Sequence, residues 1–220
     1  GIQYERRAFN LNDSRFYTDY VLKDDSKVIT VLDSKNKGVD DTIVPMIRLT
    51  NSYDGSMKTA GYLGFFRKVC HNGMHMTQTQ IEFSVKHTKG NMEVFIPRIG
   101  ELVQRFLDNE LYTIKDKIDA MKMHMIDEKQ IFQWIEDLNA QDKVFRFDKS
   151  EKNNTPSLNS QLVHDIVIRD AIATNSEPNA WLVYSAFNEF IHGKLQKNFV
   201  DQRLLDTKVF NNVSQLVGAS

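Results

Sequence analysis

The chain is 220 residues long, 41% hydrophobic and 26% charged, and its formal net charge at pH 7 is -1. This composition suits one large globular domain or two small ones, and it excludes fibrous and wholly disordered chains. The near-neutral charge also excludes a protein that holds nucleic acid simply by being basic throughout, because phosphate binding needs concentrated lysine and arginine.

The first half of the chain is expected to be β-rich. Residues 20–22 and 27–32 contain β-branched residues on either side of the polar residues 24–26, a pattern that predicts a hairpin. Residues 42–50 form the next predicted strand. Pro45 indicates that this strand lies at a sheet edge or contains a bulge, because proline cannot donate to a β-ladder.

Two turn signals follow. Residues 53–56 (Tyr-Asp-Gly-Ser) predict a tight turn, in which Gly55 takes a positive φ and Asp54 hydrogen-bonds to the nearby backbone. The dipeptide at 72–73 (Asn-Gly) predicts a two-residue type I′ hairpin, which requires positive φ at both central positions. In that register Cys70 pairs with His75 on one face of the sheet, so the helical spacing that a His71/His75 metal site needs is absent.

The second half is expected to be helical. Apolar residues at helical spacing predict a helix that includes Ile99 and either continues through Met121 or breaks near residues 108–109. Asp127 and Gln130 resemble a capping box that opens another helix, with Ile131, Trp134, Ile135 and Leu138 on its buried face.

Two further helices are predicted near residues 158–173 and after residues 176–178, and an amphipathic tail spans 201–220. The helix after residue 178 carries an apolar face that consists of Trp181, Tyr184, Phe187, Asn188, Ile191 and Leu195. Such a stripe is more typical of a core or a subunit contact than of a base-stacking platform.

The predicted fold class is therefore α+β, with an N-terminal antiparallel β-sheet with hairpins followed by a helical C-terminal half. We expect a single domain over residues 1–220, β-rich over 1–90 and helical over 91–220, with a polar loop at 148–156.

The sequence offers little for catalysis. It lacks a phosphate-binding glycine loop, a dinucleotide fingerprint and a His-Glu-x-x-His helix, so neither a cofactor nor a metal is expected. A single cysteine excludes an intrachain disulfide and agrees with a reducing compartment. No apolar run of about 18 residues occurs and the N-terminus lacks an apolar signal core, so a cytoplasmic location without a membrane partner is expected.

A set of motifs resembles a known family. The run Leu-Thr-Asn-Ser-Tyr-Asp-Gly-Ser at 49–56, then Arg67-x-x-Cys70-x-Asn72, then His87-Thr88 before a long helix is similar to the phage/plasmid-like protein family, a domain of unknown function numbered 932. Residues 179–192 resemble the closing helix of that family. The chain departs from the usual pattern at His71 and Gly73 and in its short N-terminal part.

The resemblance implies a gene carried by phages, plasmids or other mobile elements, often near recombination and single-strand-binding genes. It supplies no established reaction, so function must be argued from the residues. The motif residues to which it assigns no role are Asn51, Asp54, Gly55, Cys70, Asn72 and His87.

Positive charge is concentrated between residues 57 and 98, where six cations and two carboxylates give a net charge of +4. This favours a non-enzymatic accessory of DNA metabolism or recombination that binds single-stranded DNA on a basic and aromatic sheet surface, with homo-oligomers adding weak contacts along a strand. The candidate phosphate contacts are Lys58, Arg67, Lys68, Lys86 and Arg98, and the candidate stacking residues are Tyr62 and either Phe65 or Phe66.

Two alternatives stay open. A factor that acts on a host or phage protein through its helical half predicts an exposed apolar patch around Trp181 and Phe187. A cysteine-dependent enzyme would use Cys70 and His75 as a thiolate–imidazolium pair, with His87 as a possible base. A buried thiol beside a hydrogen-bonded histidine is the commoner outcome for such residues.

Overall fold

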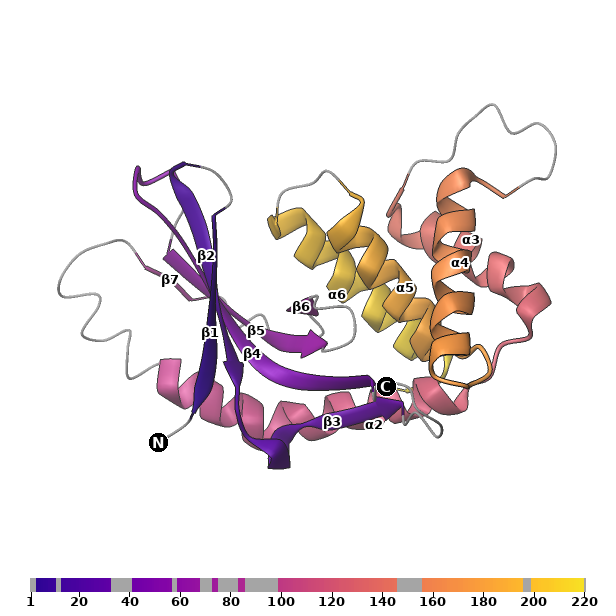
Figure 1. The fold of residues 1–220 in the computed structure, drawn as a ribbon, viewed down its shortest axis with the longest axis horizontal. Helices are drawn as coiled ribbons and strands as arrows, with labels where there is room; N and C mark the ends of the chain where they lie inside the picture. The colour runs from indigo at the N-terminus through magenta and orange to yellow at the C-terminus, as the bar shows by residue number, and fades with distance from the viewer. Residues whose placement is uncertain are drawn as a thin grey trace.

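A computed structural model of the protein describes residues 3–10, 13–32, 41–56, 59–67, 73–74, 83–85, 99–145, 156–195 and 199–219. An antiparallel sheet occupies the N-terminal part and helices occupy the C-terminal half, so the α+β prediction is confirmed (Figure 1). The described strands are β1 (Tyr4–Asn10), β2 (Arg15–Leu22), β3 (Ile29–Leu32), β4 (Asp41–Ser52), β5 (Thr59–Arg67), β6 (Gly73–Met74) and β7 (Phe83–Val85).

The sheet has the strand order β1-β2-β4-β5-β6, with β3 beside β4 and β7 beside β5. The predicted hairpin between residues 20–22 and 27–32 is wrong, because β2 and β3 both pair with β4 rather than with each other. Asp24 accepts a hydrogen bond from the Ser26 backbone (3.0 Å) and caps the short 3₁₀ turn η1 (Asp25–Lys27). The polar residues at 24–26 therefore connect two strands that run in the same direction along one side of β4, and the chain does not reverse there.

Pro45 lies inside a central strand rather than at a sheet edge. On one side it pairs with Phe65 of β5. On the other side of β4, the pairing with β2 ends at Met46 and the pairing with β3 begins at Ile43. Pro45 therefore lies opposite the gap between β2 and β3. A residue without an N–H is tolerated there because the ladder is already interrupted.

The connections on either side of β5 differ in how well the sequence predicted them. The tight turn at 53–56 is confirmed, because Gly55 has a φ of +71° and Asp54 Oδ1 accepts a hydrogen bond from the Ser56 backbone (2.9 Å). The predicted register at 72–73 is wrong, because Gly73 pairs with Phe66 and lies in β6 rather than in the turn. Met74 likewise pairs with Phe65 rather than with His71, so the register differs from the one that the Asn-Gly signal predicted.

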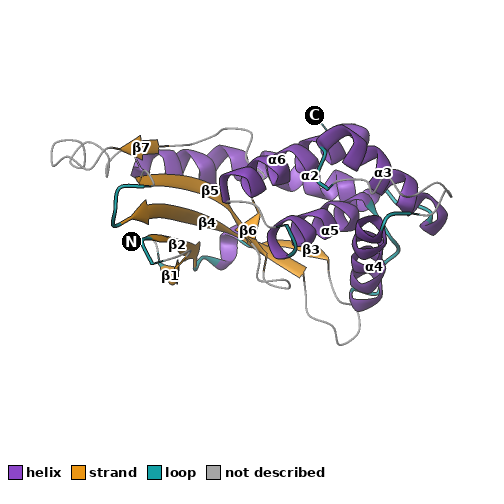
Figure 2. Cartoon of the chain, turned by 90° about the horizontal axis from the view of Figure 1, so that it is seen from above, coloured by secondary structure: helices purple, strands orange, loops and turns teal. Residues whose placement is uncertain are grey.

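The long helix of the second half is continuous but contains a π-turn. Residues 99–105 are helical, η2 (Phe106–Glu110) widens the coil, and α2 (Leu111–Met123) carries it on. The two alternatives, continuation through Met121 or a break near residue 108, thus resolve into continuation through a local bulge. This helix runs along the sheet and on into the helical half, as the second view shows (Figure 2).

The remaining helical elements are η3 (Glu128–Gln130), α3 (Ile131–Asp142), α4 (Leu158–Ala173), α5 (Ala180–Gly193) and α6 (Phe199–Leu216). Asp127 caps η3 by accepting a hydrogen bond from the Lys129 backbone (2.9 Å), and Asn179 caps α5 in the same way from Leu182 (3.1 Å). The predicted polar loop at 148–156 lies outside the described residues except for its last position.

Helix α5 is the centre of the core. Trp181 and Phe187 are both 0% exposed, and the face of α6 that contains Val209 and Phe210 is buried as well. One hydrophobic cluster joins side chains of the sheet, such as Phe65, to those of all the α-helices. The apolar patch expected around Trp181 and Phe187 is therefore interior, and the protein-interaction alternative loses the surface on which it depended.

Candidate nucleic-acid interface

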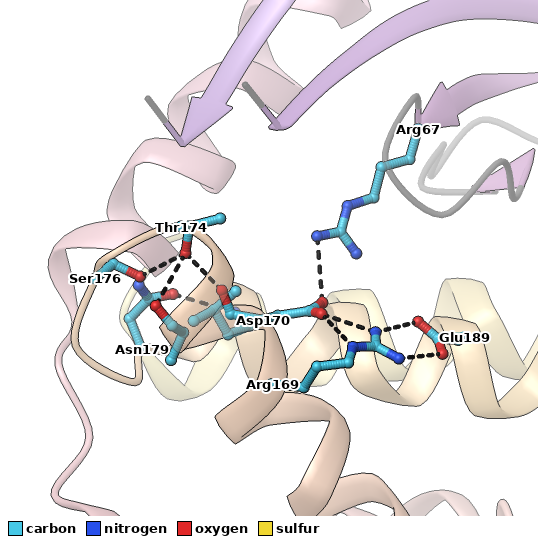
Figure 3. Close-up of polar contacts among 9 residues, drawn as sticks. Arg67, Arg169, Asp170, Thr174, Ser176, Asn179 and Glu189 are labelled. Atoms are coloured by element: carbon cyan, nitrogen blue, oxygen red, sulfur yellow. Dashed lines mark hydrogen bonds and ion pairs between the residues drawn. The ribbon is translucent and has the colours of Figure 1, made fainter. Parts of the chain in front are cut away.

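Arg67, one of the predicted phosphate contacts, is buried. Its side chain is 1% exposed at the end of β5, and its guanidinium lies 3.5 Å from the Asp170 carboxylate of α4 and 5.9 Å from the Trp181 ring of α5 (Figure 3). A cation in this position joins the sheet to the helical half. It is not available to a ligand at the protein surface.

The Asp170 carboxylate belongs to a longer chain of charges. It accepts hydrogen bonds from the Nε (2.9 Å) and Nη2 (2.7 Å) atoms of Arg169, whose guanidinium also donates to both oxygens of Glu189 (3.0 and 2.7 Å) (Figure 3). The hydrogen bonds from Arg169 lower the pKa of Glu189, and those to Glu189 raise the pKa of Arg169. Arg67, Asp170, Arg169 and Glu189 thus form one chain of ion pairs at the junction of β5, α4 and α5.

Tyr62 lies on the other face of β5. It is five residues from Arg67 on a strand without a bulge in its pairing with β4, so the two side chains point to opposite sides of the sheet. The Tyr62 ring is buried, and the guanidinium of Arg203 from α6 lies 4.9 Å from its centre. The structure therefore does not bring Tyr62 and Arg67 together.

Most of the other predicted site residues lie outside the described part of the chain. They are the candidate phosphate contacts Lys58, Lys68, Lys86 and Arg98, the motif residues Cys70, Asn72 and His87, and the histidines His71 and His75. Asn51 and Asp54 both accept hydrogen bonds from the backbone, at Ser52 (2.8 Å) and Ser56 (2.9 Å). The hydrogen bonds from Ser56 lower the pKa of Asp54, which suits a turn-forming carboxylate.

The face of the sheet that carries Tyr62 is concave. Arg7 of the edge strand β1 lies with its guanidinium 4.2 Å from the ring of Phe66 in β5, although β2 and β4 separate these two strands. Side chains so far apart in a flat sheet meet only if the sheet curls toward their face. We call this side, whose residues include Arg7, Phe9, Arg15, Tyr17, Arg48, Tyr62 and Phe66, the concave face.

Three flat groups form a column on the concave face. The rings of Phe9 and Tyr17, which lie directly opposite each other in β1 and β2, are stacked with centres 4.8 Å apart and planes 22° apart. From the other side, in β4, the Arg48 guanidinium lies 4.2 Å from the Tyr17 ring. Phe9 is 41% exposed, so the column is open at its outer end.

The inner end of this column is fixed by a buried ion pair. Arg48 donates from Nε (2.6 Å) and Nη2 (2.7 Å) to the two carboxylate oxygens of Asp19, and both residues are buried. Such a two-point pair holds the guanidinium plane in one orientation. Burial raises the pKa of the Tyr17 hydroxyl, so this ring stays neutral at physiological pH.

An exposed cation lies near the open end of the column. Arg15 lies two residues before Tyr17 on the same face and is exposed, and its Nε donates to the Ser56 hydroxyl (2.9 Å). The opposite end of the concave face is unlike this one. There, a cavity of about 560 Å³ is lined by two cations and three carboxylates, among them Arg7, Glu5 and Asp24. That lining disfavours a phosphate, so the end with Arg15 is the candidate interface.

Sequence analysis missed this surface because it did not recognise the first strand. Residues 4–10 and 15–19 alternate between the two faces, which is the signal that places Arg7 with Phe9 and Arg15 with Tyr17. Two carboxylates and an asparagine among these residues weakened the strand signal. The pairing of Arg48 with Asp19, 29 residues apart, has no local signature at all.

The described residues form neither a metal-binding cluster nor a membrane-spanning helix. Within the described ranges, no three His, Cys, Asp or Glu side chains gather closely enough to hold a metal ion. The helices in that part of the chain are all too short or too polar to cross a bilayer.

Comparison with known proteins gives one match. No curated protein and no solved structure matches the chain. The family model described as a domain of unknown function, DUF932, matches residues 1–209, which includes the whole sheet and nearly all of the helical half. The chain therefore belongs to the DUF932 family.

Proposed function

We propose that the protein binds single-stranded nucleic acid on the concave face of its sheet, as a non-enzymatic accessory of DNA metabolism or recombination. The observation that supports this most directly is the column formed by Arg48, Tyr17 and Phe9, with its outer ring 41% exposed. A nucleobase stacked on Phe9 would be the next flat group in that column.

The column suits an unpaired base. Every base offers a π-face, so stacking on Phe9 needs no particular sequence. In a duplex both faces of each base are already covered by neighbouring pairs, and a ring at the protein surface cannot add to them. A single strand with free base faces is therefore the form of nucleic acid that this surface would favour.

The charges near the column support a weak contact with the backbone. Arg15 and Tyr17 are two residues apart, so their side chains emerge about 7 Å from each other along β2. A guanidinium at that separation can reach a phosphate next to a base stacked on Phe9. Since Arg48 is already paired with Asp19, only a few phosphates would be neutralised, and we expect a shallow dependence of affinity on salt.

The resemblance to phage/plasmid-like proteins suggests the biological context of this binding. We expect the activity to serve the DNA of a phage, plasmid or other mobile element in the cytoplasm of its host. The proposal is one of binding without catalysis, because the sequence contains no recognisable catalytic motif.

The test is a titration of a fluorescent oligothymidylate with the purified protein at low salt, followed by anisotropy. We expect the Phe9→Ala variant to bind roughly 5-fold to 100-fold more weakly, the range set by the loss of one stacked base. Phe9→Trp should retain the affinity of the parent. The matched control is Tyr4→Ala, because Tyr4 is an exposed aromatic residue of the same strand (55%) on the opposite face.

Two results would overturn the proposal. One is an absence of binding at low salt by the folded parent protein. The other is equal weakening by Phe9→Ala and Tyr4→Ala, because a contact on the concave face must distinguish side chains of opposite faces. Circular dichroism of each variant confirms that the fold is retained before the affinities are compared.

A further inference from the structure

Strand β1 leaves one side of its backbone without a strand neighbour in the part of the chain that the structure describes. It has seven residues, and its partner among the described strands is β2 alone. From Tyr4 to Ala8 its residues alternate between exposed and half-buried, and Tyr4 and Phe9 are large exposed aromatics on its two faces. It contains no proline and no bulge in its pairing, two of the features that protect an edge strand from pairing with another chain, but it does carry the charged residues Glu5, Arg6 and Arg7.

The charges of β1 select a partner strand. Glu5 and Arg7 are two residues apart on one face and already form an ion pair in the chain (2.7 Å). A second copy of β1, antiparallel and related by a two-fold axis through Arg6, places Glu5 of each copy opposite Arg7 of the other. Two opposite-charge pairs then flank the axis on the concave side, and such cross-strand pairs are favourable.

The other registers that keep the faces aligned fit less well. An axis through Glu5 or Arg7 sets two like charges against each other on the concave face. An axis through Ala8 brings together no opposite charges and leaves Glu5 beyond the paired segment. An axis through Arg6 also opposes two like charges, but these are exposed, on the convex face, and free to splay into solvent.

We propose that β1 is a self-association edge, and that two copies of the protein join their sheets through β1 pairs centred on Arg6. The occupant of the edge is a second copy of this chain, chosen by the self-complementary charges of Glu5 and Arg7. The joined sheets place their two concave faces side by side, with the two Phe9 rings about 20 Å apart along the strand direction. The inference stands apart from nucleic-acid binding, because its test uses protein alone.

A cysteine scan of β1 tests the register. In a Cys70→Ser background, single cysteines replace Glu5, Arg6, Arg7 or Ala8 in four separate variants. Residues that face their own copies across the axis have Cα atoms about 4.5–5.5 Å apart, which lies within the span of a disulfide. Under mild oxidation we expect Arg6→Cys to give a covalent dimer at least several-fold faster than the other three variants.

A charge exchange provides the second measurement. Native mass spectrometry and sedimentation should show a dimer of the parent, a weaker dimer of Glu5→Arg, and recovery in the double variant Glu5→Arg/Arg7→Glu. A monomeric parent at every concentration, fastest cross-linking at Glu5, Arg7 or Ala8, or a failure of the double variant to recover the dimer would each overturn the proposal. Circular dichroism identifies any variant that has unfolded, and the cross-linking result of the remaining variants then decides.

Discussion

The open edge of the sheet, formed by β1 and β2, carries an exposed Arg15 two residues from the Phe9–Tyr17 stack. At the closed end of the sheet, which is the end of β5, Arg67 is 1% exposed and lies between Asp170 and Trp181. Both arginines extend from strands of the same sheet. The helices make the difference, because α4 and α5 cover the end of β5 but do not reach β1 and β2. Positive charge counted along a sequence therefore becomes a binding surface only where no other element covers it.

The largest effect is expected from the ion pair that supports the open edge. Asp19→Ala leaves the buried guanidinium of Arg48 without its two-point partner, and we expect the free energy of unfolding to fall by about 3–4 kcal/mol. Urea denaturation measures this loss. Affinity for single strands should fall as well, because Arg48 no longer supports the Tyr17 ring from behind.

A double variant separates the two effects of Asp19→Ala. Replacing both partners, in Asp19→Ala/Arg48→Met, removes the unpaired buried charge and should recover most of the stability. It should not recover the affinity, since the column has lost its inner member. Full recovery of both quantities would show that the column plays no part in binding.

The second effect belongs to the closed end of the sheet. Arg67→Met should lower the free energy of unfolding by about 2–3 kcal/mol, less than Asp19→Ala, because Asp170 keeps its hydrogen bonds from Arg169. The affinity of the folded variant for single strands should equal that of the parent. Unchanged stability with lost affinity would instead make Arg67 a surface contact and would reverse the comparison between the two ends.

The architecture was predictable where its signals were local. The helical periodicity of residues 158–173 and the turn at Asp54 and Gly55 depend on neighbours a few residues away, and the structure has both as expected. The hairpin predicted around residues 24–26 failed because the same polar residues serve a chain reversal and a capped 3₁₀ offset equally well. Only the pairing with β4, which is remote in sequence, decides between them.

The candidate site was less predictable for a related reason. Arg67 had the sequence context of a cationic surface, and its burial depends on Asp170, more than 100 residues later in the chain. The column of Phe9, Tyr17 and Arg48 combines three strands, two of them poor in β-branched residues. Alternation within β1 could have grouped Arg7 with Phe9, but no single-sequence signal could have joined either of them to Arg48.

The smallest effect is expected at the exposed cation of the open edge. Arg15→Gln removes one charge from an exposed side chain whose Nε donates to the Ser56 hydroxyl, so stability should change by less than about 0.5 kcal/mol. If Arg15 contacts one phosphate, the slope of log affinity against log salt should become shallower by about 0.7 in measurements with single strands. Arg6→Gln is the control, because Arg6 is an exposed arginine of the edge strand on the convex face and should leave the slope unchanged. Equal changes in the two variants would mean that the affinity for single-stranded DNA depends only on the net charge of the sheet edge. The concave face would then have no special role in binding.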